Sequence, residues 1–252
     1  MKVTILGCGT STGVPVIGCP CSVCTSPNPK DKRTRTSVII TINGKNILID
    51  TSTDLRQQAI ANNVQRIDAV IYTHPHADHI HGIDELRSFN MLQKEKIPCY
   101  GSEFTINRIK EMFNYIFTTE EKESWKPELE IFKITSAFEV CDIKIQPVDV
   151  MHGQMSIFGY RIENFGYITD CSLVPDKSKE MLKGIEVLVL GALREKPHPT
   201  HFSISQAVEL VQELKPKQTI LTHLSHNIGF EETNKSLPDG IELAYDGMEI
   251  EI

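Results

Sequence analysis

One short stretch of the sequence, YTHPHADHIHGIDEL (72–86), gathers the side chains best suited to bind metal. Three imidazoles and one carboxylate come from His74, His76, Asp78 and His79. Residues i and i+2 of an extended chain project to the same side, so His74 and His76 can bind one ion. Asp78 and His79, a turn further on, can face a second ion. These donors suit a borderline divalent metal such as zinc, manganese or iron, so the stretch predicts a metal centre.

A second group of possible ligands lies near the start of the sequence, in GCPCSVC (18–24). It holds three of the seven cysteines: Cys19, Cys21 and Cys24. Three thiolates can occupy one face of a tetrahedral zinc, whereas a structural zinc site takes four ligands. Three free thiols or a redox pair would be the alternative. The candidates for a fourth ligand are Cys8, His81 and His226.

The elements that must position these side chains are predicted from hydrophobic patterning. The strand 68–73 runs directly into the histidines, and Asn43-Gly44 and Glu163-Asn164 are hairpin turn signals. The expected strands are 3–6, 37–42, 46–50, 68–73, 142–150, 157–162, 165–170, 186–191, 218–223 and 248–252. The expected helices are 53–63, 83–95, 103–116, 176–183 and 204–214, the last capped by Ser203 or Ser205. Hairpins combined with alternating strands and helices predict a layered α/β protein with mixed sheets.

Length, composition and charge narrow the class of protein. With 252 residues and 40% hydrophobic content, we expect one domain over 1–252. The net charge of −7 argues against a nucleic-acid partner, which usually needs a basic face. No apolar run is long enough for a membrane span and no signal peptide is visible, so we expect a cytoplasmic protein with reduced cysteines. A homodimer is the default expectation. The polar segment 117–130 is expected to be a lid or a plain surface loop.

The motif His74-Pro-His76-Ala-Asp78-His79 resembles the metallo-β-lactamase superfamily. Further segments resemble that family in the same order: NILIDTSTD, VDVMHG, FGYITDC and TILTHLSH. The resemblance implies an αββα sandwich, with two mixed β-sheets flanked by helices. It also implies roles for four more residues: Asp50 beneath the metal site, and Asp170, His152 and His223 as ligands.

The resemblance further implies how the ligands are shared between two catalytic divalent metals, zinc or manganese. One ion would take His74, His76 and His152. The other would take Asp78, His79 and His223, with Asp170 bridging. Two ions roughly 3.5–4 Å apart can activate a shared water and clamp an oxyanion. Such a centre suits hydrolysis and does not by itself select among phosphodiester, thioester, lactone and lactam.

Two segments favour the phosphodiesterase branch of this superfamily, and PhnP-like phosphoribosyl cyclic phosphodiesterases above all. These segments are LGCGTSTGVP (6–15), which could offer Thr10, Ser11 and Thr12 to a phosphate, and HPTHFSISQA (198–207). The resemblance implies that His201 is a general acid or phosphate contact, and that Asp78 is a catalytic residue as well as a ligand. We expect a small, cyclic, sugar-linked phosphodiester as substrate. A tRNase Z-type endonuclease, a thioester or lactone hydrolase, and a diiron redox or non-catalytic binding protein are the alternatives.

His226 is the preferred fourth ligand for the cysteines. It follows His223 by three residues, so one loop can deliver His223 to the catalytic ions and His226 to a structural zinc. The resemblance to PhnP-like proteins implies the same Cys3His arrangement. A closed site of four ligands leaves no position for water, which predicts a scaffolding role.

Overall fold

The computed structural model describes residues 1–118 and 125–252, which form two mixed β-sheets. The first sheet has seven strands, in the order β14 (Met248–Glu251), β1 (Lys2–Gly7), β2 (Ser37–Ile42), β3 (Lys45–Ile49), β4 (Ala69–Ile71), β5 (Ile97–Gly101) and β6 (Leu129–Lys133). The second also has seven, in the order β13 (Ile241–Leu243), β12 (Gln218–Thr222), β11 (Val187–Gly191), β10 (Phe165–Ile168), β9 (Met155–Ile162), β8 (Ile143–His152) and β7 (Phe138–Val140). In each sheet, antiparallel hairpins on one side continue into parallel strands on the other.

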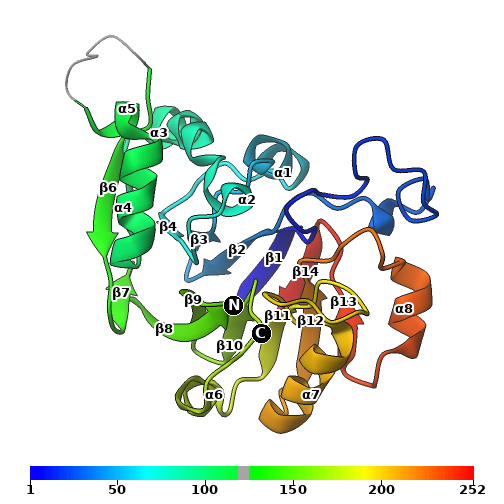
Figure 1. Cartoon of the computed structure of the whole chain (residues 1–252). Coiled ribbons are helices and arrows are strands. Elements are labelled where there is room, and N and C mark those ends of the chain that lie inside the picture. Colours follow the sequence, from blue (N-terminus) through cyan, green and yellow to red (C-terminus); the bar gives the residue numbers. More distant parts are fainter. Residues whose placement is uncertain (119–124) are drawn as a thin grey trace.

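The two sheets face each other across a shared apolar core (Figure 1). Ile5, Ile40 and Ile49 of the first sheet belong to the same buried cluster as Tyr160 and Val189 of the second. Burial of aliphatic side chains contributes roughly 25 cal/mol for each Å² removed from water. This interior therefore holds the sheets in the arrangement that brings their strand ends together.

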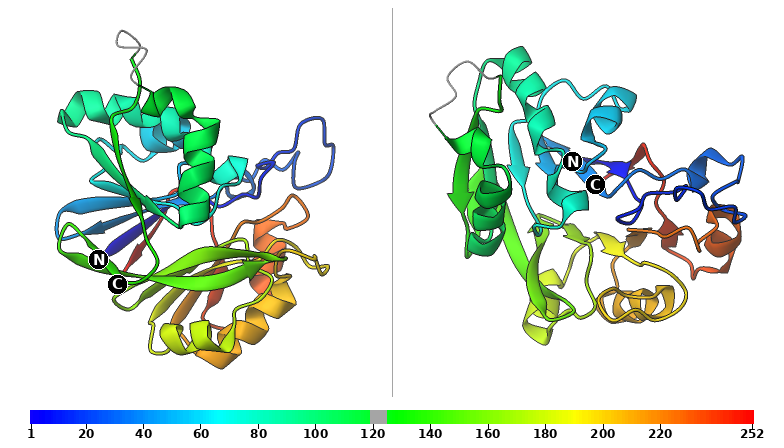
Figure 2. Two further views of the ribbon diagram at one scale, coloured as in Figure 1. Left: turned by 60° about the vertical axis from the view of Figure 1, so that its left-hand side comes forward. Right: turned by 45° about the horizontal axis from the view of Figure 1, so that its top comes forward.

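Helices cover the outer faces of both sheets, as the left view of Figure 2 shows. On the first sheet, buried side chains come from α1 (Leu55–Ala61), α2 (Ala77–Ile80), α3 (Leu86–Gln93), α4 (Glu103–Met112) and α5 (Asn114–Phe117). On the second they come from α6 (Asp176–Leu182), α7 (Ile204–Leu214) and α8 (Phe230–Ser236). Short 3₁₀ helices span Pro29–Asp31 and Ile83–Glu85. The αββα sandwich predicted from the sequence is confirmed.

Local signals in the sequence account for several element boundaries. Both hairpin turns are confirmed, and Asn43 and Glu163 adopt the positive φ that such turns require. Ser203 caps α7 in a capping box with Gln206. Four strands were not predicted: β5, β6, β7 and β13. The helices α2 and α8 were not predicted either.

The expected lid or loop at 117–130 lies partly outside the described residues, because 119–124 are not described. The described part of this segment is not all loop, since Phe117 ends α5 and β6 begins at Leu129. Among the helices of the described residues, none has the length and apolar character needed to cross a bilayer.

Candidate active site

The metal-ligand candidates converge because four of them follow or end a strand, and the other three lie at the start of α2 or within it. His74 lies just beyond β4, His152 ends β8, Asp170 follows β10 and His223 follows β12. Asp170 and His223 have positive φ values of 51° and 59°. Non-glycine residues rarely adopt this left-handed backbone, and such strain often marks functional sites. The sharp turns aim side chains from both sheets at one edge of the sandwich.

The first group consists of His74, His76 and His152, whose ligand atoms lie within 4.8 Å of one another. His74 Nε2 is 3.0 Å from His76 Nδ1. The His152 ring lies across from both, with centroid distances of 5.5 Å to His74 and 5.0 Å to His76. His152 Nδ1 donates to the carbonyl oxygen of Thr200 at 2.7 Å, which leaves its Nε2 lone pair free for a cation.

The second group consists of four buried residues: Asp78, His79, Asp170 and His223. His79 Nε2 is 3.4 Å from Asp78 Oδ2 and 3.3 Å from Asp170 Oδ1. Asp78 Oδ2 and His79 Nε2 are both buried, and neither has a hydrogen-bond partner among the described residues. Unpartnered buried polar atoms are costly, and these two point at each other across a space lined by ligand-type donors. The residues present therefore fit a divalent cation.

Asp170 connects the two groups through its two carboxylate oxygens. Oδ1 lies 3.3 Å from His79 Nε2 and 3.1 Å from His223 Nδ1, both in the second group. Oδ2 faces the other way, 3.9 Å from His74 Nε2 in the first group and 3.2 Å from His201 Nε2. This is the geometry that a carboxylate shared between two neighbouring ions requires.

Burial and charge bring His74, His223 and Asp170 into the forms that bind cations. Burial lowers the pKa of His74 well below its usual value, and it lowers the pKa of His223 to about 4. Burial alone would raise the pKa of Asp170, but His223 and His79 reverse that and bring it well below the ordinary value. Neutral imidazoles and ionised carboxylates are the forms that bind metal. His79 is the exception: burial would lower its pKa, but neighbouring carboxylates, Asp170 above all, raise that pKa well above its usual value, so a cation would have to displace its proton.

Asp50 lies beneath the second group. Its Oδ2 accepts hydrogen bonds from His79 Nδ1 at 2.7 Å and from the Thr73 hydroxyl at 2.7 Å. Its Oδ1 accepts from the Thr73 backbone N–H at 2.8 Å. These bonds fix the His79 ring with Nε2 turned toward Asp78 and Asp170. Such partners orient a ligand and raise its basicity.

His201 lies at the edge of the shared carboxylate, with its ring stacked on His223 at a centroid distance of 5.1 Å. Its donor atom also falls within ligand distance of His152 and Asp170. Sequence reasoning missed its neighbours His198 and Thr200. His198 Nδ1 is 3.1 Å from His201 Nδ1, and the Thr200 hydroxyl is 2.9 Å from the same atom. The only sequence signal was a second histidine three positions before His201.

The three predicted phosphate contacts separate in the structure. Thr10 is buried, and its hydroxyl lies 3.1 Å from His223 Nε2, so it belongs to the site. Ser11 and Thr12 are exposed. The Ser11 carbonyl accepts a hydrogen bond from Arg35, and the Thr12 hydroxyl donates to the carbonyl of Gly13. No described contact connects the side chains of Ser11 and Thr12 to the metal-ligand candidates.

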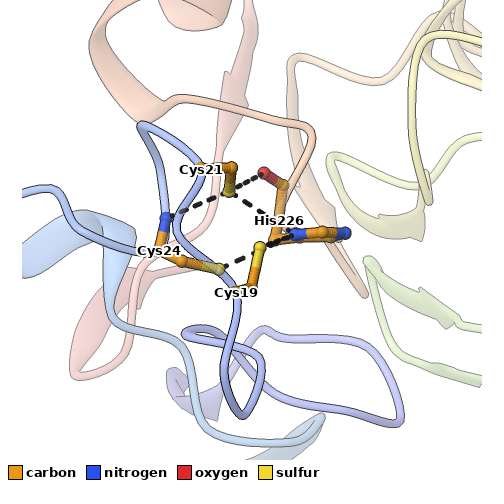
Figure 3. A group of neighbouring side chains, drawn as sticks. All are labelled: Cys19, Cys21, Cys24 and His226. Atoms are coloured by element: carbon orange, nitrogen blue, oxygen red, sulfur yellow. Dashed lines mark hydrogen bonds between the residues drawn. The ribbon is translucent and has the colours of Figure 1, made fainter.

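The three cysteines meet His226, as Figure 3 shows. His226 Nδ1 is 3.3 Å from Cys19 Sγ, 3.5 Å from Cys21 Sγ and 3.6 Å from Cys24 Sγ. We call these four residues the cysteine cluster. The pKa of the Cys21 thiol is lowered to about 6, chiefly by the backbone N–H of Cys24, which favours the thiolate that binds metal. The set fits a tetrahedral zinc.

The other two candidates for a fourth ligand lie elsewhere. Cys8 is buried against the carbonyl of Ala244, and the His81 ring packs edge-on against Phe113. Neither residue belongs to any of the potential metal-binding groups of the described residues.

Buried Arg33 ties the cysteine-bearing loop to the loop that carries His223 and His226. Its guanidinium donates to the carbonyls of Ser225 and Ile228 at 3.1 and 2.8 Å. It also pairs with Asp31 at 3.3 Å. The cysteine-bearing segment, dark blue in Figure 1, extends from the sandwich beside the segment that leads into α8. The two candidate centres are therefore joined through one loop.

The fold and the geometry define a protein of metallo-β-lactamase fold whose side chains are arranged for divalent metals. Residues 45–224 match the family described as the beta-lactamase superfamily domain, and the chain belongs to that family. The family resemblance stated from the sequence is confirmed.

Individual relatives differ in what they are named. A crystal structure described as a new diphosphatase from the PhnP family is 44% identical, covers 100% of this chain and 97% of its own, and superposes with a TM-score of 0.93. The octanoyltransferase of Porphyromonas gingivalis is 37% identical over 99% of this chain and 51% of its own length. Zn(2+)-bound PqqB from Methylobacterium extorquens, at 18% identity over the full length of both chains and a TM-score of 0.82, shares the fold. The chain spans about half the length of the curated relatives it matches.

Proposed function

We propose that the protein is a metal-dependent phosphodiesterase acting on a small phosphodiester, cyclic and sugar-linked. The observation that carries this proposal is the position of His201, whose Nε2 lies 3.2 Å from the shared carboxylate of Asp170. A proton donor beside a two-ion centre suits a reaction in which an alkoxide leaves phosphorus. Similarity over almost the whole chain to a protein described as a PhnP-family diphosphatase supports hydrolysis at phosphorus, the coarser part of this proposal.

The catalytic centre would hold two divalent ions, zinc or manganese. His74, His76 and His152 would bind one ion, Asp78, His79 and His223 the other, and Asp170 both. When bound, the pair supplies positive charge for the phosphoryl oxygens and an activated water. The cysteine cluster would hold one structural zinc.

The chain's own residues would perform the remaining tasks. His201 donates a proton from Nε2 to the leaving sugar oxygen, a contribution typically worth about 10² to 10⁴ in rate. Asp78 has a buried carboxylate oxygen without a hydrogen-bond partner and would serve in catalysis as well as in binding. Thr10 sets the place of His223 through its hydroxyl. Ser11 and Thr12 would reach a phosphate only from the exposed rim.

Other substrate classes can be distinguished from a cyclic phosphodiester by experiment. RNA would need a basic track along the protein, and the net charge of −7 disfavours it. The relative named an octanoyltransferase makes acyl thioesters a necessary comparison, and the relative described as a diphosphatase does the same for diphosphates. A homodimer acting without a membrane or nucleic-acid partner is part of the proposal.

The test joins metal analysis of purified protein to a substrate panel. The panel holds bis(p-nitrophenyl) phosphate, ribose 1,2-cyclic phosphate, 2′,3′-cyclic nucleotides, a diphosphate ester, an octanoyl thioester and a tRNA precursor. We expect selective turnover of the cyclic sugar phosphate, lowered about 10²- to 10⁴-fold in His201→Ala with metal content unchanged. Turnover of the diphosphate ester, the thioester or the tRNA precursor alone would refute the proposal, and full activity of His201→Ala would refute the acid role.

A further inference from the structure

The loop that carries His201 is held in place by hydrogen bonds between its own residues. It joins β11 to α7, and its base is closed by two backbone hydrogen bonds, from Leu193 N–H to the Phe202 carbonyl and from Ile204 N–H to the Arg194 carbonyl. The Arg194 guanidinium donates to the carbonyls of Lys196 and Pro197 at 3.1 and 3.0 Å. The loop therefore presents His198 and His201 in a fixed relation, although both lie outside any helix or strand.

Three atoms of this loop form a tight triangle. His198 Nδ1, His201 Nδ1 and the Thr200 hydroxyl oxygen lie 2.9 to 3.2 Å from one another. The backbone N–H of Thr200 also points at His198 Nδ1, at 3.4 Å. Because that N–H approaches the nitrogen, His198 Nδ1 acts as an acceptor and its own ring hydrogen belongs on Nε2.

Because His198 Nδ1 is an acceptor, it determines whether His201 Nδ1 carries a hydrogen. Two bare ring nitrogens 3.1 Å apart would repel each other, so the shared hydrogen must lie on His201 Nδ1. The pKa of His198 is lowered by burial and then by its neighbours His201 and Arg194, which keeps it neutral and able to accept. His201 Nε2 faces the carboxylate oxygen Asp170 Oδ2 at 3.2 Å, so it carries a second hydrogen whenever His201 serves as the acid.

We propose that His198 is a positioning residue for His201: with the Thr200 hydroxyl it holds the hydrogen on Nδ1, so that Nε2 is the atom that exchanges a proton with the substrate. This inference rests on the proposed function of His201. In the reaction, the Nε2 proton passes to the leaving oxygen while the Nδ1 hydrogen stays bonded within the triangle. Water restores the Nε2 proton after the product departs. The role parallels that of a carboxylate that fixes the tautomer of a catalytic histidine.

Leaving-group dependence provides the kinetic test. His198→Phe removes the acceptor, whereas His198→Asn places a side-chain oxygen where Nδ1 was. With a sugar-alkoxide leaving group, we expect His198→Phe to lower kcat about tenfold with KM within about twofold, because only proton donation is impaired. With bis(p-nitrophenyl) phosphate, whose leaving group needs no proton, the loss should shrink to about twofold or less. His198→Asn should restore most of the rate, and Lys196→Ala in the same loop serves as the control.

A double variant tests whether His198 acts through His201. Adding His198→Phe to His201→Ala should cause no additional loss, because the two residues act as one unit. Equal losses on both esters, or a further loss in the double variant, would overturn the inference.

Nuclear magnetic resonance of the zinc-loaded, ¹⁵N-histidine-labelled protein needs no substrate. His201 Nδ1 should carry a hydrogen in the parent and in His198→Asn, and should carry it only part of the time in His198→Phe. An unchanged His201 spectrum in His198→Phe would refute the positioning role. If the parent protein hydrolyses no ester at all, the proposed function fails, and these spectra still decide the role of His198.

Discussion

Two candidate metal centres share one loop and are built in opposite ways. His223 belongs to the centre at the strand ends, and His226, three residues later, belongs to the cysteine cluster. The first centre takes ligands from both sheets, and most of them are buried. The second takes three thiols from a single short segment of a protruding loop, and only Cys24 is buried. The centre at the strand ends depends on the packing of both sheets. The cysteine cluster would instead hold together a loop that protrudes from the sandwich.

The difference is the one expected between a catalytic metal site and a structural one. At the strand ends, Asp50, Thr10, Thr73 and Thr200 contact the imidazoles at the ring nitrogens turned away from the other ligands. Buried atoms of Asp78 and His79 have no hydrogen-bond partner among the described residues. Orienting contacts around an open space suit a centre that must accept a substrate. In the cysteine cluster, four ligand atoms close on one another and leave no place for water.

The largest effect should come from Asp170→Asn, which removes the charge that both halves of the strand-end centre share. We expect turnover to fall by at least about 10³-fold, since a two-ion centre supplies several kcal/mol of charge stabilisation. Metal analysis should show loss at the strand-end centre while the cysteine cluster keeps its metal. Parent-like turnover with unchanged metal content would show that Asp170 is not shared.

His226→Ala should act mainly on stability. Losing a structural zinc costs several kcal/mol, and in a chain of this size each kcal/mol corresponds to about 2–4 °C in Tm, so we expect a fall of roughly 10 °C. Turnover should fall less than in Asp170→Asn, through the displaced His223. His81→Ala is the matched control, since His81 belongs to neither centre, and it should keep its metal content. Thermal unfolding with metal analysis measures both, and an unaltered Tm in His226→Ala would remove the distinction between the centres.

Asp50→Asn tests whether the contacts behind the ligands matter at the strand ends. The amide can still accept a hydrogen bond from His79 but loses the charge, so we expect metal affinity to drop about 10- to 100-fold. Competition with a chromogenic chelator measures that affinity separately for the loosely and tightly held metal. The metal of the cysteine cluster should be unaffected. Equal weakening of both centres would instead indicate general loosening of the fold.

Local sequence patterns predicted the features that depend on residues adjacent in the chain. The strand-to-histidine stretch 68–79 and the hairpin at Asn43-Gly44 are examples. β5 was missed because its five residues, IPCYG, include the strand breakers proline and glycine. β6 was missed because it begins inside a polar segment. The grouping of Asp170 with His79 depends on packing between the sheets, so only the resemblance to a family could suggest it.

The smallest effect concerns the glycine-rich turn at 6–15. Thr10 contacts His223, whereas Ser11 and Thr12 face solvent, so the three predicted phosphate contacts should differ. We expect Thr10→Val to lower turnover several-fold, because loss of one hydrogen bond to a ligand costs about 1 kcal/mol. Thr10→Ser should retain the parent rate, and Ser11→Ala and Thr12→Ala should remain within about twofold, as surface changes usually do. Steady-state kinetics on the preferred diester distinguishes these variants. A raised KM in Ser11→Ala or Thr12→Ala would instead show that the rim of the turn binds the phosphate, and would extend the strand-end centre toward the loop that carries the cysteine cluster.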